Sequence, residues 1–178
     1  MVGKNDHVSL VKHSNYDEVA YPSNVRVNGG ITTIEQANKA IEQIENQLVA
    51  YPRELIGILA VRNEELNEIA AHLSQSALSN QFTLCHSNDF DPDKPIWLST
   101  ISSGKGLEFR AVHLIGMDHV SKTGPAQRRL SFTGVTRAKT ALTVYHQKTL
   151  PGYLDAALRT VCNPSPAPIS KSRLFGKE

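Results

Sequence analysis

The chain has 178 residues, 40% of them hydrophobic, which suits one α/β domain with a buried core. A formal net charge of +2 excludes a general attraction to nucleic acid, so any such binding needs a local patch. Cys85 and Cys162 share no metal-binding spacing and are interpreted as thiols in a reducing compartment. No stretch reaches the ~18 apolar residues of a membrane span, and no signal peptide is visible, so we expect a cytoplasmic protein without membrane contact.

Residues 1–30 are predicted to be irregular or to contain a strand, and they end in the turn signal Asn28-Gly29-Gly30. A helix should follow, because Thr32 or Thr33 can cap it and Glu35 or Gln36 can complete a capping box. We predict that this helix ends before Pro52, since proline cannot continue a helix.

Apolar and β-branched runs alternate with helical periodicity over the rest of the chain. The predicted strands are 55–61, 82–85, 96–101, 112–117 and 141–145, and the later helices are one capped by Asn63, one at Arg128–Lys139 and one at 152–161. Such alternation predicts an α/β fold with a mainly parallel sheet covered by helices on both faces. We expect this domain to span 31–162 and a proline-rich, flexible tail to occupy 163–178.

The segment Thr100–Phe109 joins hydroxyl, lysine, glycine and glutamate side chains between two predicted strands. It is not a phosphate-binding P-loop, because Ser99 stands where the first glycine belongs and Gly106 where a serine or threonine belongs. No other stretch matches that motif, and no apolar run ends in an Asp-Glu pair that would hold Mg²⁺. We therefore expect that this chain alone does not hydrolyse a nucleotide.

Within this segment, Gly106 permits close approach of a ligand to the backbone, and Glu108 can accept a hydrogen bond from a sugar hydroxyl. The hydroxyl groups of Thr100, Ser102 and Ser103 can donate to the phosphates of a nucleic acid strand. Read alone, the same residues also describe a solvated turn with a surface Glu–Lys pair.

Two arginines stand beside predicted strand ends, where open α/β sheets place ligands. Arg137, expected on a helix, could neutralise charge on a γ-phosphate held by another domain, and Arg62 follows the first buried strand. Each also has a plain alternative, Arg137 as a helix-surface arginine and Arg62 as a hydrated strand-end arginine.

Taken together and in this order, the segments resemble the UvrD/Rep-type superfamily 1A DNA helicases. Thr100–Phe109 is similar to their motif V, T-[IV]-H-x-x-K-G-L-E-[FW], and Arg129–Lys139 to their motif VI, R-R-L-x-Y-V-A-L-T-R-A-K. The run 56–63 is similar to their motif IV, an apolar strand that ends in arginine. The resemblance covers most of residues 55–146.

This resemblance implies roles for individual residues. Arg62 and Arg137 would contact the γ-phosphate of ATP, which with Mg²⁺ would be bound mainly by a partner motor domain that this chain lacks. Gly106 and Glu108 would lie near the nucleotide, with Glu108 on its ribose. The DNA contacts would come from the motif V turn, namely Thr100, Ser102, Ser103 and Lys105. Thr136 would couple the two sites.

The sequence departs from the family pattern at three positions. Ser102 replaces a histidine, Phe132 a tyrosine and Gly134 an alanine. A short loop, 86–95, also stands where the larger helicases insert an accessory domain.

The resemblance thus implies a RecA-like fold and the second motor domain of an ATP-dependent DNA helicase. Such a domain binds single-stranded DNA and pairs with an N-terminal motor domain in cis or in trans. The alternative is a non-enzymatic, helicase-like accessory or interaction module. The retained set Arg62, Glu108 and Arg137 speaks against that alternative, because a docking module has no chemical need for all three.

Overall fold

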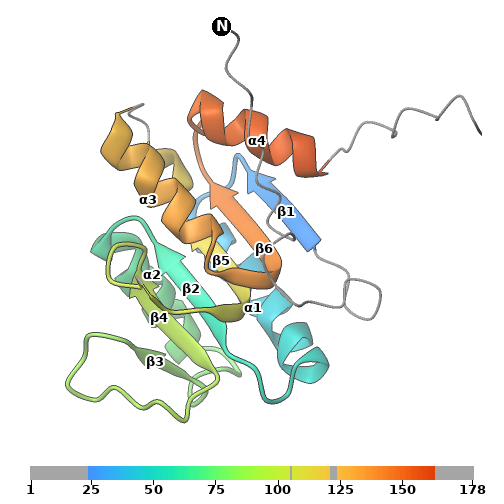
Figure 1. Cartoon of the computed structure of the whole chain (residues 1–178). Helices are drawn as coiled ribbons and strands as arrows, with labels where there is room; N and C mark the ends of the chain where they lie inside the picture. Colours follow the sequence, from blue (N-terminus) through green and yellow to red (C-terminus); the bar gives the residue numbers. More distant parts are fainter. Residues whose placement is uncertain (1–23, 105, 121–123, 163–178) are drawn as a thin grey trace, which may run out of the picture.

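The computed structural model describes residues 24–104, 106–120 and 124–162, and Figure 1 shows their arrangement. The strands are β1 (Asn24–Gly29), β2 (Ile56–Ala60), β3 (Phe82–Leu84), β4 (Ile96–Thr100), β5 (Phe109–Ile115) and β6 (Ala138–His146). The helices are α1 (Thr33–Ala50), α2 (Asn63–Ser74), α3 (Pro125–Val135) and α4 (Gly152–Cys162), with a single 3₁₀ turn, η1 (Met117–His119).

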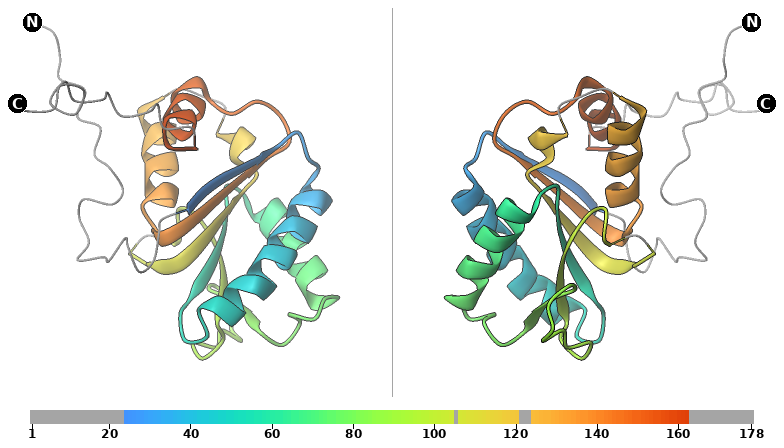
Figure 2. Two further views of the ribbon diagram at one scale, coloured as in Figure 1. Left: turned by 90° about the vertical axis from the view of Figure 1, so that its right-hand side faces the viewer. Right: turned by 90° about the vertical axis from the view of Figure 1, so that its left-hand side faces the viewer.

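The described strands form one sheet in the order β1-β6-β5-β2-β4-β3, and every neighbouring pair is parallel. Helices α1 and α2 cover one face, and α3 and α4 cover the other (Figure 2). Successive residues of β2 serve both layers, because Ile58 packs under α1 and α2 while Leu59 packs on the opposite face. The predicted α/β, RecA-like fold class is confirmed.

Local sequence signals account for the first two helices. Thr32 caps α1, and Glu35 returns the bond, since the Thr32 backbone N–H donates to the Glu35 carboxylate at 2.7 Å. The predicted capping box is therefore present. The second helix differs from the prediction, because Asn63 is its first residue and Arg62 is its N-cap, with no side-chain hydrogen bond from that cap.

The predicted helix at Arg128–Lys139 is wrong at both ends. Helix α3 begins at Pro125, whose fixed φ angle suits a first helical position, and ends at Val135. Residues Ala138 and Lys139 already belong to β6, where Ala138 pairs with Phe109. Pairing with a neighbouring strand outweighs the local helical pattern here.

The N-terminal segment predicted to be irregular or to contain a strand holds β1, which pairs with β6. The sheet therefore includes residues that precede residue 31, the predicted start of the domain. The remainder of that segment and the tail predicted at 163–178 lie outside the described residues. Among the helices that the structure does describe, none is long and apolar enough to cross a membrane.

Candidate functional site

The predicted site residues occupy both ends of the parallel sheet. Thr100 is the last residue of β4, and Arg62 stands two residues beyond β2, so both lie at the carboxyl edge. Glu108 directly precedes β5 and Arg137 directly precedes β6, so both lie at the amino edge. The sheet thus separates these residues into two pairs, one at each end of the strands.

At the carboxyl edge, the chain leaves β4 in a tight turn. The Ser103 N–H donates to the Thr100 hydroxyl oxygen at 3.3 Å, and the Gly104 N–H donates to the Thr100 carbonyl at 2.9 Å. Ser102 and Ser103 are exposed, so their hydroxyl groups face solvent. Lys105, the predicted cation of this turn, lies outside the described residues.

Arg62 lies at the same edge and binds a buried carboxylate. Its Nε donates to Glu65 Oε1 at 2.9 Å, and its Nη2 also contacts Glu65, whose side chain is only 4% exposed. The imidazole of His119 reaches the same Glu65 oxygen at 2.9 Å. The hydrogen bond that Arg62 donates to Glu65 raises the pKa of Arg62, and the Glu65 carboxylate offsets its charge.

The segment between β4 and β5 carries the chain from one edge of the sheet to the other. Gly104 is buried near its start, where an added Cβ would lie 3.3 Å from Leu59 Cδ2. Gly106 has a φ angle of 93°, a left-handed conformation that side chains disfavour. The two glycines let a short segment cross between the edges without a helix.

At the amino edge, Arg137 joins this segment to the end of α3. Its Nη1 donates to the Leu107 carbonyl at 3.0 Å and its Nε to the Thr133 carbonyl at 3.2 Å. Its own carbonyl accepts from the Phe109 N–H at 2.9 Å. Among the ion pairs of the described residues, none gives Arg137 a carboxylate partner.

The sequence predicted Arg137 on a helix, but Arg137 stands in the turn between α3 and β6. Thr136 closes α3, because its hydroxyl donates to the Phe132 carbonyl at 2.9 Å and its N–H to the same carbonyl at 3.0 Å. Gly134 lets α3 approach the sheet, since an added Cβ would lie 3.1 Å from Leu114 Cδ2.

Glu108 lies at the same edge of the sheet as Arg137 and pairs with Lys139, with 3.5 Å between Glu108 Oε2 and Lys139 Nζ. Both side chains are largely exposed, at 64% and 49%. The pairing of β5 with β6 shifts register between Phe109 and Ala111. Such an irregularity re-aims side chains, and it lies next to Lys139 here.

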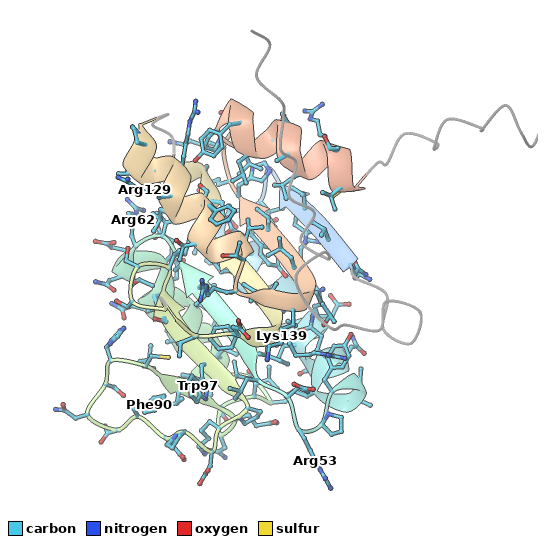
Figure 3. All side chains as sticks on the ribbon, viewed as in Figure 1. Arg53, Arg62, Phe90, Trp97, Arg129 and Lys139 are labelled. Carbon is cyan, nitrogen blue, oxygen red and sulfur yellow. The ribbon has the colours of Figure 1, made fainter. Side chains whose placement is uncertain are left out.

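The structure does not bring Arg62 and Arg137 together. Ala60 is in register with Ile115, the last residue of β5, and Ala138 with Phe109, its first. At about 3.3 Å per residue, the length of β5 puts the two edges roughly 20 Å apart. Figure 3 also shows Arg62 well separated from Lys139. Arg62 and Arg137 therefore start from opposite ends of the strands in this chain.

Two contributors were missed at the sequence level. Glu65 lies three residues after Arg62, which is the helical spacing of an ion pair, and that spacing could have found it. The contact between Arg137 and the Leu107 carbonyl could not be predicted from the sequence, because every residue has a backbone carbonyl and the residue type does not reveal which one binds.

Comparison with known proteins supports the resemblance. Residues 95–145 match the sequence model of the family described as UvrD-like helicase C-terminal domain. This stretch holds β4, the crossing segment, β5, α3 and most of β6. It contains the segments similar to motifs V and VI, whereas the run 56–63 lies outside it. The predicted resemblance to the C-terminal motor domain of these helicases is confirmed. No curated protein matches the chain.

Two solved structures share the fold. The C-terminal domain of a possible DNA helicase from Lactobacillus plantarum WCFS1 is 21% identical, with a TM-score of 0.57, over 74% of this chain and 78% of that one. The SWI2/SNF2 ATPase core of Sulfolobus solfataricus, solved in complex with double-stranded DNA, is 11% identical, with a TM-score of 0.58. This second match covers 83% of our chain but only 32% of the ATPase core, so our chain corresponds to about a third of it.

Proposed function

We propose that this chain is the C-terminal motor domain of an ATP-dependent superfamily 1A DNA helicase, inactive in hydrolysis by itself. ATP and Mg²⁺ would be bound mainly by an N-terminal motor domain that carries the P-loop, in cis or in trans. In this proposal the two edges of the sheet have separate tasks. The amino edge faces the nucleotide, and the carboxyl edge faces single-stranded DNA.

The observation that carries this proposal is the direct joining of the two helicase-like segments. Arg137 binds the Leu107 carbonyl through its side chain and the Phe109 N–H through its backbone, so the end of motif VI is fixed to the end of motif V. The other end of motif V is the turn at Thr100. A displacement at one edge is thus passed to the other by a covalent segment of eight residues, 101–108.

The residues at the amino edge suit a nucleotide. Arg137 is held by two carbonyl oxygens, which orient the guanidinium without neutralising it, and that charge is available to a γ-phosphate. The exposed carboxylate of Glu108 can accept from ribose hydroxyl groups once it leaves Lys139, and Gly106 leaves room for close approach. Bound ATP would supply the phosphoryl group, and Arg137 would offset the charge that develops on it.

The residues at the carboxyl edge suit a DNA backbone. The exposed hydroxyl groups of Ser102 and Ser103 can donate to phosphates, and the turn bonds to Thr100 fix their position. Lys105 would add a cation. We place Arg62 on this DNA side, anchored by Glu65, and Thr136 as the coupling residue at the end of α3.

The test is ATP hydrolysis by the full chain, alone and mixed with a polypeptide that carries the P-loop motor domain, with and without oligothymidylate. The chain alone should release no phosphate. The mixture should hydrolyse ATP in a DNA-stimulated reaction that Arg137→Ala abolishes and Arg53→Ala preserves, since Arg53 is an exposed arginine on the loop between α1 and β2.

Hydrolysis by the chain alone that disappears in Arg137→Ala would overturn the proposal. A stable complex with the P-loop domain that Arg137→Ala leaves fully active would instead favour an interaction module. Binding to oligothymidylate should also weaken steeply with salt, because each phosphate contact releases counterions.

A further inference from the structure

The two edge strands of the sheet differ in how they are protected. Strand β3 has three residues, and the loop after it folds back, with the Asp91 N–H donating to the Thr83 hydroxyl at 3.0 Å. Strand β1 has six residues and contains no proline. Among the described residues, β6 is the only strand that pairs with β1. Proteins usually shorten, charge or cover an edge of this length, because its unpaired backbone groups can pair with another chain.

Each side of β1 is hollowed. A polar hollow of about 500 Å³ lies between β1 and α1, and its lining includes Asn24, Arg26, Asn28, Lys39 and Glu42. A second hollow lies between β1 and α4, and its lining joins Val25, Val27 and Leu158 with the ion pair of Asp155 and Arg159. Figure 1 shows β1 at the margin of the sheet beside α4. An added strand would therefore find space for its side chains on both faces.

The two hollows differ in chemistry. On the α1 side, Arg26 and Lys39 outnumber the single carboxylate, that of Glu42. On the α4 side, Val27 is 38% exposed, although it stands next to a packed apolar layer. Because side chains of a strand alternate between the two faces, one face of an added strand would meet net positive charge. The other face would meet an aliphatic surface bordered by the Asp155–Arg159 ion pair.

We infer that the outer edge of β1 accepts an extended segment of a partner polypeptide, in which acidic and aliphatic residues alternate. Backbone hydrogen bonds supply the pairing, and the two hollows select the alternation. A second copy of this chain is a poor occupant, because antiparallel pairing of β1 with itself that keeps both faces of the sheet continuous sets one Arg26 opposite or diagonally beside the other in the central registers. This lateral surface of β1 is separate from the amino and carboxyl ends of the strands, which we assign to ATP and DNA.

The test uses the full chain and a fluorescent peptide of alternating valine and glutamate, long enough to cover the six residues of β1. Fluorescence anisotropy should give a Kd of about 1 mM or lower. Hydrogen exchange should slow at residues 24–29 when the peptide is added. Two control peptides should fail, one with the same residues in blocks and one N-methylated at alternate backbone nitrogens.

A charge exchange sharpens the test. Arg26→Glu should weaken binding of the Val-Glu peptide about fivefold, which corresponds to the upper range of exposed ion pairs. The variant should bind a Val-Lys peptide more tightly instead. Arg53→Glu makes the same charge change away from β1 and should leave the affinity for both peptides unchanged.

The inference is overturned if the alternating peptide does not bind, or if the block and N-methylated peptides bind equally. It is also overturned if light scattering shows a dimer that the peptide dissociates, because the occupant is then a second copy. None of these outcomes depends on ATP or DNA, so the inference and the proposed helicase function fail independently.

Discussion

Arg62 and Arg137 are both arginines next to the ends of buried strands, yet their surroundings are opposite. Arg62 is paired with the buried carboxylate of Glu65, and His119 shares that carboxylate. Arg137 is held by two backbone carbonyl oxygens, which fix its direction and leave its charge unneutralised. The difference indicates that removal of Arg62 costs stability, whereas removal of Arg137 costs activity.

The largest expected effect is on catalysis. In an assembly with a P-loop motor domain, Arg137→Ala should lower kcat by at least about 100-fold, because arginines on a γ-phosphate supply roughly 10³–10⁵ in rate. Arg62→Ala should leave kcat within about threefold at saturating DNA, since its edge lies about 20 Å away. Steady-state phosphate release measures both.

Arg137→Lys separates charge from geometry in the same assay. Lysine retains the positive charge but cannot bind the Leu107 carbonyl and a phosphate at once through a planar fork. Equal loss of kcat in Arg62→Ala and Arg137→Ala would remove the distinction between the two edges.

The second effect is on the pH dependence of the free energy of unfolding, and it comes from the middle of the sheet, away from both edges. His113 is fully buried, with Nδ1 3.0 Å from the Tyr145 hydroxyl oxygen and Nε2 2.9 Å from Gln47 Oε1. Desolvation lowers the pKa of His113 to about 3. The unfolded chain keeps a histidine pKa near 6.5, so it binds the proton first as the pH falls.

The free energy of unfolding that His113 contributes is thus complete above pH 6.5 and is lost progressively as the pH falls toward 3. Between pH 6.5 and 4.5 the loss should be about 2 kcal/mol, because one pH unit is worth about 1.4 kcal/mol per proton. Urea unfolding of wild type and His113→Gln measures it. Parallel pH dependence in the two proteins would show that His113 does not set the acid sensitivity.

The third effect tests the carboxyl edge. Arg62→Ala leaves the buried Glu65 carboxylate with His119 as its remaining partner, so the free energy of unfolding should fall by about 1 kcal/mol. Arg62→Ala/Glu65→Ala should recover part of this loss. Arg53→Ala should stay within about 0.5 kcal/mol of wild type in thermal unfolding. Arg137→Ala loses two hydrogen bonds to carbonyl oxygens but leaves no buried charge unpaired, so it should lose less stability than Arg62→Ala. A greater loss in Arg137→Ala than in Arg62→Ala would reverse the comparison.

The smallest effect is at Glu108. Its pair with Lys139 is exposed, so Glu108→Gln should change the free energy of unfolding by less than about 0.5 kcal/mol. In the assembled motor it should raise KM for ATP about threefold, the cost of one weakened hydrogen bond to ribose. Lys139→Gln, which removes the competing partner, should leave KM unchanged or lower it. An unchanged KM in Glu108→Gln would exclude the ribose contact.

The sheet was predictable where the sequence pattern is local. The fully buried β2 reads as an apolar run, and the α1 capping box reads from Thr32 and Glu35. The division of the site between two edges was not predictable, because it depends on where α3 ends. Residues 136–139 continue a helical pattern, and only the pairing of Ala138 with Phe109 turns them into a strand. That pairing joins residues 29 positions apart, so the local periodicity of the sequence cannot predict it.

The separation of the two edges can be tested most directly by amide chemical shifts of the full chain titrated with oligothymidylate. The account predicts that the largest shifts fall on residues 100–104 and on the Arg62–His119 cluster at the carboxyl edge. Residues 107–109 and 137–139 at the amino edge should shift less than these, because they sense the DNA only through the segment 101–108. Shifts concentrated at the amino edge, or an unperturbed spectrum at saturating DNA, would contradict it.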